Sequence, residues 1–441
     1  MARFDTGSSK VQRHSPDVWN LEGVNSKQEE TATMKEPWRS PKHFVSPLNY
    51  LPEVTGDFRL AKKVKIHDVT LRDGEQETGI ALPKDDKIRL AEALAEAGVD
   101  RIEAGMPAVS KQDEAAIREI VKRNLGPEIF SFCRCVMDDV KLAVDCGVKG
   151  IVIEIPASEH IIEYAYGWPL SKAIDLSVRA TAYAHEQGLY VSFFTIDATR
   201  AKLDWLLQII QKVAEEGHMD SLTLVDTMGA ASVPAVRYYV RYIKERVKQP
   251  LEGHFHNDFG LAVANSLAAV EEGVEVVHTT VLGMGERAGQ AATEQVALGL
   301  ELLYGVKTGV KLEKLKSLCC LASELTGHVM PANQPVAGAD MFKLESGIPA
   351  SWWVRVKDTH PTEVFPVLPS MLGHEEPQIV IGKGSGMDSV VLWLGQVGLE
   401  ATPTQVTAIT SAVKERSMQK KGLLDAAEFK QLAQQTMGTV K

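Results

Sequence analysis

Two short polar motifs carry most of the chemistry that this sequence suggests. The first, Thr-Leu-Arg-Asp-Gly-Glu-Gln, contains Arg72 and Asp73, and the second, Gly-His-Phe-His-Asn-Asp, contains His254 and His256. Side chains two positions apart on a strand project from the same face, so both imidazoles could bind one ion. Asp73 adds a carboxylate oxygen, and such a mixed set of ligands suits Mg, Mn, Fe or Zn. The motifs predict a divalent-metal site at which the Arg72 guanidinium holds a carboxylate or enolate oxygen.

These motifs lie within a long alternation of apolar runs and segments of helical period. Apolar runs cover residues 64–69, 99–105, 129–134, 150–155, 190–196, 221–226, 251–256 and 274–282, and helical segments such as 84–97, 171–187, 201–216, 233–247, 261–272 and 292–304 lie between or after them. This pattern predicts an α/β fold, a (β/α)8 TIM barrel. A doubly wound open sheet is the alternative. That fold would place a glycine-rich phosphate turn after the first strand, where this chain has the charged segment 71–75.

Polar side chains follow or end most of the predicted strands. The carboxyl ends of barrel strands meet at one face, which is where active sites form. The side chains in question are Arg72, Asp73, Glu103, Arg134, Glu154, Asp197, Thr227, His254 and His256. We therefore expect them to surround one site.

The alternation also suggests how the chain is divided. We expect a polar N-terminal tail and extended arm over residues 1–60, with the first 35 or so as the tail, and a barrel over residues 61–305. A mostly helical accessory region should follow over residues 306–441. Its irregular stretch from 331 to 386 is too long to be passive, so we expect it to cover the mouth of its own barrel or a partner's.

Composition excludes several classes of function. The 441 residues carry 48 basic and 58 acidic side chains, a net charge of -10, which argues against nucleic acid as a partner. No apolar run is long enough to span a membrane, and the segment from Met1 to Asn20 lacks the apolar core of a signal peptide. Five cysteines without a CxxC pair are typical of reduced thiols. We therefore expect a cytoplasmic protein.

The motifs resemble those of the pyruvate-carboxyltransferase-like (HMGL-like) superfamily of metal-dependent TIM barrels. It includes 2-isopropylmalate, citramalate and homocitrate synthases and hydroxymethylglutaryl-CoA lyases. The resemblance covers residues 62–300 well and 311–435 more loosely, and its specific motifs are 70–76, 254–258 and 283–289. Segments 103–108 and 381–386 are most similar to the condensing synthases, especially the nitrogenase-associated homocitrate synthases.

The resemblance implies a Claisen-type condensation of acetyl-CoA, or another acyl donor, with a 2-oxo acid in a homodimer. It implies that Asp73, His254 and His256 are the metal ligands and that Arg72 steadies the enolate or substrate oxygen. The predicted substrate-binding residues are Arg72, Gln76, Arg134, Thr227 and Glu252.

Four residues depart from the synthase pattern, and one of them, Gln290, is expected near the metal. Ile196 stands where the synthases have Glu, Gln290 where they have Asn, and Pro349 and Gly384 where they have His. The residues expected to bind the metal match the synthase motifs. The residues expected to act on the acetyl-CoA methyl differ from those motifs. Glu154 is a candidate replacement catalytic residue, although an ion pair with Arg134 or Lys149 would explain it equally well. Further candidates in the irregular stretch are His360, Glu363 and His374.

Two other functions compete with condensation. The first is a metal-dependent carbon–carbon lyase or aldolase acting on a hydroxy acid or hydroxyacyl-CoA, although the turn 283–290 has no cysteine of the kind found in the lyases. The second is a non-catalytic paralogue, against which the intact metal motifs argue. Glu286 and Arg287 are interpreted as a buried ion pair, and Trp352 and Trp353 as part of a dimer interface.

Overall fold

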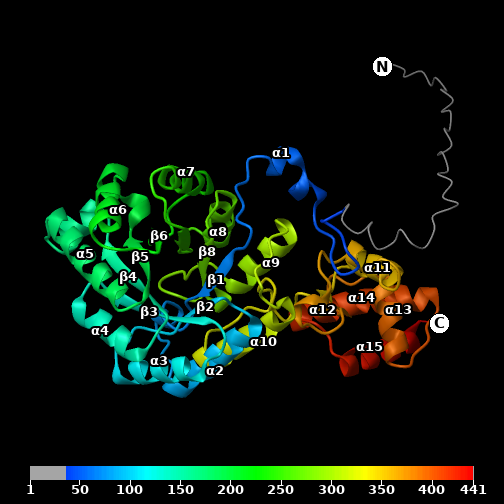
Figure 1. Ribbon diagram of the computed structural model, residues 1–441. Coiled ribbons are helices and arrows are strands. Elements are labelled where there is room, and N and C mark those ends of the chain that lie inside the picture. Colours follow the sequence, from blue (N-terminus) through cyan, green and yellow to red (C-terminus); the bar gives the residue numbers. More distant parts are fainter. Residues whose placement is uncertain (1–35, 441) are drawn as a thin grey trace, which may run out of the picture. The chain divides into compact units, whose positions relative to one another are not determined.

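The eight predicted strands form a closed parallel barrel in the computed structural model, which describes residues 36–440 (Figure 1). The strands are β1 Lys65–Asp68, β2 Arg101–Glu103, β3 Glu128–Arg134, β4 Gly150–Pro156, β5 Tyr190–Ile196, β6 Ser221–Asp226, β7 Leu251–Phe255 and β8 Val276–Thr279. They pair in chain order, and β1 closes the barrel against β8, with Lys65 opposite Val276. The prediction of a (β/α)8 barrel is confirmed, whereas the predicted N-terminal tail lies outside the described residues.

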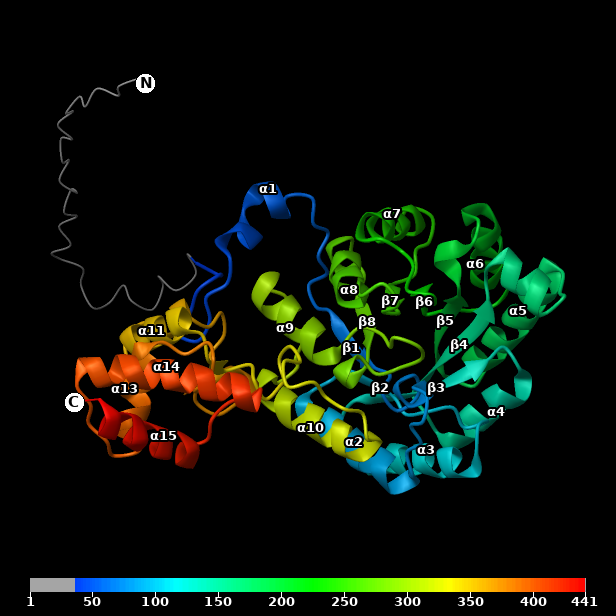
Figure 2. The ribbon, with the colours of Figure 1, turned by 180° about the vertical axis from the view of Figure 1, so that it is seen from behind.

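Helices alternate with the strands and lie around the barrel (Figure 2). They are α2 Lys84–Ala97, α3 Lys111–Arg123, α4 Met137–Cys146, α5 Leu170–Glu186, α6 Leu203–Glu216, α7 Val233–Lys244, α8 Ala262–Glu271 and α9 Thr293–Leu303. Helix α3 shows how the sequence sets these bounds. Ser110 caps its first turn by accepting a hydrogen bond from the Asp113 amide, and Lys122 and Arg123 stand in its last turn, where cations are favourable.

The strands are short and almost entirely buried. In β4, only Glu154 has more than marginal exposure, and the Val and Ile side chains around it suit a strand that is covered on both faces. Because the sheet is closed, alternate side chains of every strand point into the barrel. The polar residues at the strand ends are therefore brought to one rim.

The segment before the barrel packs on its outer helices. It contains two short helical turns, η1 Pro47–Tyr50 and α1 Pro52–Thr55. The Tyr50 hydroxyl donates to the Leu302 carbonyl (2.8 Å), and the ring of Phe58 lies 5.8 Å from that of Tyr304. This arm therefore contacts the end of α9.

The remaining helices are α10 Leu315–Thr326, α11 Gly347–Val356, α12 Pro369–Leu372, α13 Met387–Gln396, α14 Pro403–Lys420 and α15 Ala426–Thr439. The last three share a separate apolar cluster that includes Val390, Ile409 and Phe429. Thr402 and Asp425 form capping boxes at the starts of α14 and α15. Within the stretch predicted to be irregular, helix α11 and the paired strands β9 Lys343–Leu344 and β10 Gln378–Ile379 were not expected. Among the described residues, no helix is both long and apolar enough to cross a membrane.

Candidate metal centre at the barrel mouth

Three of the predicted side chains meet at the mouth of the barrel. The Nε2 atoms of His254 and His256 lie 3.2 and 3.9 Å from Oδ2 of Asp73 and 3.3 Å from each other. All three side chains are buried. These atoms are close enough to bind a single ion. The structure thus brings together His254 of β7, His256 directly after that strand, and a carboxylate from the turn after β1.

A glycine turn holds Asp73 in place. Gly289 has a positive φ, and a Cβ at that position would collide with the Gly283 carbonyl oxygen, so no other residue fits. The chain reverses direction at Gly289, and this places Gln290 next to the metal centre. Gln290 donates from Nε2 to Oδ2 of Asp73 at 2.5 Å. The glutamine that departs from the synthase pattern therefore contacts a predicted metal ligand directly.

The charges at this centre suit a divalent cation. Burial raises the pKa of Asp73, but the Arg72 guanidinium and the two histidines outweigh it and hold that pKa below its ordinary value. Burial lowers the pKa of His254 to about 3. An ionised carboxylate and a neutral imidazole are the forms that bind metals.

Unsatisfied polar atoms also fit an ion at this place. Oε1 of Gln290 is buried without a hydrogen-bond partner among the described residues. One carboxylate, two imidazoles and a nearby amide oxygen form a donor set suited to Mg, Mn, Fe or Zn. The residues present therefore fit the divalent ion that the sequence suggests.

Arg72 lies beside the centre, in the wall of a cavity of about 540 Å³. Its Nε donates to Glu103, its Nη1 lies 3.3 Å from Oε1 of Gln76, and its guanidinium carbon lies 4.1 Å from the centre of the Phe132 ring. Nη2 is buried and has no partner among residues 36–440. This N–H group is available to an oxygen of a molecule bound in the cavity.

Glu154 is a further titratable group that lines the same cavity. Burial raises its pKa to about 7, although Arg72 and Arg134 act in the opposite direction. The ion pair that could have explained this residue is not formed, because Arg134 instead binds both oxygens of Asp139, at 2.7 and 3.0 Å. Glu154 can therefore take up or release a proton near neutral pH.

The other predicted substrate-binding residues divide into two groups. Gln76, Arg134 and Thr227 line the cavity beside Ile196, the residue that replaces the synthase glutamate. Glu252 does not, because it is fully buried in the barrel interior and its carboxylate is already occupied by Arg101, Ser221 and His278. The prediction that Glu252 contacts substrate is withdrawn: it lies near the start of β7, below the cavity.

Several residues away from the centre also differ from expectation. Glu286 and Arg287 are 57% and 35% exposed, so their contact is not a buried ion pair. Among the candidates in the stretch 331–386, His374 binds the Val336 carbonyl and Glu363 pairs with Arg39. No described residue of that stretch lines the main cavity. This stretch therefore adds no described residue to the wall of the main cavity, although its Gln334 lines a smaller pocket beside the glycine turn 283–290.

Sequence reasoning missed the polar layer beneath the metal centre. His67, Arg101 and His278 are fully or almost fully buried inside the barrel, next to Glu252. Each stands in a predicted apolar run, and a charged or imidazole side chain in such a run was the signal that could have revealed them.

Comparison with known proteins agrees with this geometry. The model of the HMGL-like family matches residues 63–321. A putative (R)-citramalate synthase from Archaeoglobus fulgidus is 41% identical over 82% of this chain and 73% of its own length. A homocitrate synthase from Methanothermobacter thermautotrophicus is 34% identical over 87% of this chain and 96% of its own length.

Solved structures show the same fold. The HMG-CoA lyase from Bacillus subtilis superposes with a TM-score of 0.56 at 24% identity, over 62% of this chain and 97% of that protein. At this identity the likeness concerns the fold alone. The match of the family model and the identity to the synthases extend over most of the barrel and beyond it. The chain therefore belongs to the HMGL-like family.

Proposed function

We propose that this protein is an acyltransferase that condenses acetyl-CoA with a 2-oxo acid in a metal-dependent Claisen reaction. The observation that carries this proposal is the cavity in which Asp73, His254 and His256 lie beside Arg72 and Glu154. Relatives named as citramalate and homocitrate synthases, at 41% and 34% identity, support the same reaction class.

The residues that line the cavity have different roles in the proposed reaction. Asp73, His254 and His256 would hold a divalent ion, which supplies a Lewis acid for the ketone of the 2-oxo acid. The unpartnered Nη2 of Arg72 donates to an oxygen of the substrate or of the developing enolate. Gln76, Arg134 and Thr227 line the remaining wall and bind the body of the 2-oxo acid.

Glu154 is our candidate for the base. Its carboxylate takes a proton from the acetyl-CoA methyl, and the resulting carbanion equivalent attacks the ketone carbon to form the new carbon–carbon bond. The ketone oxygen takes up a proton and becomes a hydroxyl. Water then cleaves the thioester to a carboxylate and free CoA thiol, which makes the condensation irreversible.

Cleavage of a hydroxy acid, the alternative function, would use the same ion and Arg72. The glycine turn from Gly283 to Gln290 has no cysteine, and the curated relatives at 34–41% identity are named as synthases. The solved lyases share only the fold at 24% identity or less. Condensation is therefore the better-supported direction.

We also propose a homodimer in the cytoplasm. Ile348 and Trp352 on α11 and Met387 and Val391 on α13 are large apolar side chains that are more than half exposed. Such a surface suits an interface with a second copy. All five cysteines are free, as in a reducing compartment.

The reaction is tested by following free thiol. Protein loaded with Mg, Mn or Zn is incubated with acetyl-CoA and a panel of 2-oxo acids, with and without a chelator. We expect thiol release that requires both the metal and one class of 2-oxo acid, and that is lost in His256→Ala but retained in the control His185→Ala, whose ring stacks on His218 away from the cavity. Metal-dependent release of pyruvate or acetate from hydroxy acids, with no thiol from any 2-oxo acid, would establish the lyase instead.

A further inference from the structure

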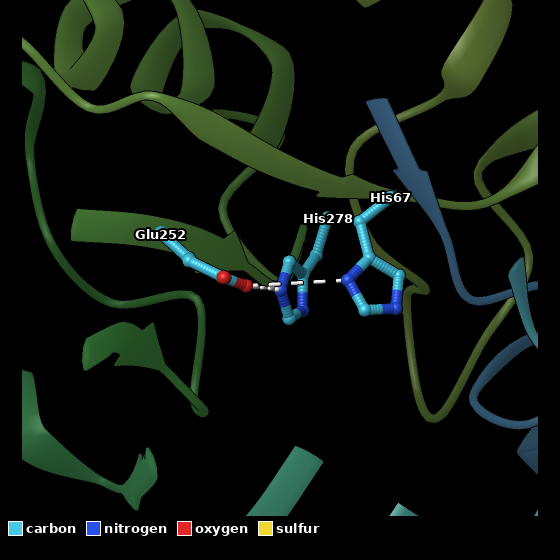
Figure 3. Close-up of side chains that lie close together, drawn as sticks. All are labelled: His67, Glu252 and His278. Carbon is cyan, nitrogen blue, oxygen red and sulfur yellow. Dashed lines mark hydrogen bonds and ion pairs between the residues drawn. The ribbon is translucent and has the colours of Figure 1, made fainter. Parts of the chain in front are cut away.

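A second cluster of polar side chains lies inside the barrel below the metal centre. It contains His67 from β1, Glu252 from β7 and His278 from β8, all of them fully buried. Figure 3 shows the Glu252 carboxylate directed at the ring of His278, with His67 beside that ring. Buried groups of this kind need an explanation because desolvating them is costly.

This cluster connects to the metal centre through one ring. Nδ1 of His254 lies 3.3 Å from Nδ1 of His278, and Nε2 of His278 lies 2.8 Å from Oε2 of Glu252. The three side chains form a continuous chain of contacts from the barrel interior to the metal centre. Nε2 of His254 is left facing Asp73 and His256.

The contacts determine where each proton lies. If Nε2 of His254 binds the ion, its proton must be on Nδ1, which then donates to His278. Nδ1 of His278 therefore accepts, so its own proton is on Nε2, where it is donated to Glu252. Only this arrangement satisfies all the ring nitrogens in the chain.

The contacts of Glu252 leave one of its carboxylate oxygens to accept the hydrogen bond from His278. Its Oε1 accepts hydrogen bonds from Nη1 of Arg101 at 2.8 Å and from the Ser221 hydroxyl at 2.7 Å. Oε2 remains for His278. Arg101 also keeps the carboxylate charge balanced inside the barrel, so Glu252 can stay an ionised acceptor without contact to solvent.

The other histidine of the metal centre, His256, has no contact within residues 36–440 like that between His254 and His278. Nδ1 of His256 is buried and has no hydrogen-bond partner among the described residues. The two rings that face the same ion are therefore anchored differently: His254 is fixed from behind, whereas His256 is held by its place after β7 and its backbone contact with Gln290.

The cluster could instead be a second metal site, since His67, Glu252 and His278 offer three ligand atoms close together. Two observations argue against this. Both ring nitrogens of His278 already have partners, and Glu252 already binds a guanidinium, whose positive charge would repel a cation. His67 has no hydrogen bond among the described residues: its ring packs against Phe130 and His278, and its nitrogens lie 3.8 Å from Glu103 and 4.0 Å from Glu252.

We propose that Glu252 and His278 are positioning residues that fix the tautomer and orientation of His254 for metal binding. This rests on the proposed metal centre and deepens it, because it assigns a role to a carboxylate that does not reach the substrate. Partners of this kind, behind a metal-binding histidine, typically change metal affinity about 10- to 100-fold when removed.

The test compares two buried rings of the same cluster. Binding of Zn²⁺ alone is measured by competition with a fluorescent chelator for the wild type, His278→Phe and the control His67→Phe. We expect one ion per chain in the wild type, a dissociation constant about 10- to 100-fold higher in His278→Phe, and a change below about threefold in His67→Phe. Both substitutions keep a ring at the position, and only the first breaks the chain to His254.

Unchanged affinity in His278→Phe overturns the proposal. So do two ions per chain in the wild type with one lost in His67→Phe, because the cluster is then itself a metal site. If the wild type binds no ion, the proposed metal centre fails and this inference fails with it. A neutron structure of the metal-loaded wild type decides the matter if His278→Phe does not fold: a deuteron on Nε2 of His278 supports the proposal, and one on its Nδ1 overturns it.

Discussion

Replacing Glu154 with Gln should lower activity and raise stability at the same time. The substitution keeps the size of the side chain and removes its charge. As the proposed base, Glu154 must be ionised to accept a proton, so wild-type turnover should fall as the pH drops through about 7, the pKa that burial gives this group. In Glu154→Gln, turnover should be about 10²- to 10⁴-fold lower, and the inflection near neutral pH should be absent.

The stability effect follows from the same pKa. Burial raises the pKa of Glu154 from 4.5 to about 7, so protonation of the folded protein contributes stability that is complete below the ordinary pKa of 4.5 and lost as the pH rises through about 7. At higher pH the wild type holds a buried charge that glutamine lacks. We expect the advantage of Glu154→Gln in free energy of unfolding to grow by about 3 kcal/mol between roughly pH 4 and pH 8.

Both effects are measurable with one pair of proteins. Urea unfolding of the metal-free forms at several pH values gives the stability difference, and thiol release by the metal-loaded forms gives turnover. Metal-free protein is used for unfolding because metal binding has its own pH dependence. A stability difference that does not change with pH would refute the raised pKa. An unaltered pH profile of turnover in Glu154→Gln would refute the role as base.

Three further predictions concern separate parts of the chain. Arg72→Lys removes the unpartnered Nη2 and should lower kcat/KM for the 2-oxo acid about 10²-fold in the thiol assay; an unchanged value would exclude the proposed contact. Lys87→Met removes a buried cation from the partly buried carboxylates of Glu75 and Asp113 and should lower the free energy of unfolding by about 2 kcal/mol in urea; no loss would mean that the network is neutral. Light scattering should give a mass twice that of the 48.3 kDa chain, and Trp352→Glu should shift it toward the monomer; a monomeric wild type would contradict the interface.

The sequence predicted the barrel well because each buried strand is a recognisable apolar run, and each polar motif ends or follows one. The two-residue spacing of His254 and His256 was enough to place both rings on one face. Asp73 follows a different strand, but strands of a closed parallel barrel end at a common rim, so the fold itself supplied the third group.

The depth at which a side chain lies inside the barrel could not be predicted in the same way. Glu252 has the same parity as His254 and therefore also points inward, yet it stands two residues earlier along β7 and so one layer deeper in the barrel. How deep that layer lies depends on the stagger between strands, such as the pairing of Thr223 with Glu252, which no single strand encodes.

Helix α11 was missed for a different reason. It begins with Gly347, contains Pro349 in its first turn and continues through Trp352 and Trp353, a sequence with weak intrinsic helix propensity. Packing forms it nonetheless, since the buried ring of Trp353 lies against Phe365. Such tertiary contacts are not visible in local sequence pattern.

The central claim is that a carbon–carbon bond forms between an acyl-CoA methyl and a 2-oxo acid held at Asp73, His254 and His256. The most direct measurement supplies metal-loaded protein with acetyl-CoA labelled with ¹³C at the methyl and with the 2-oxo acid that releases most thiol. The products are then observed by ¹³C NMR. We predict a labelled CH2 group beside a tertiary alcohol, absent in His256→Ala. Labelled acetate as the sole product would contradict the account, because thiol release would then be simple thioester hydrolysis.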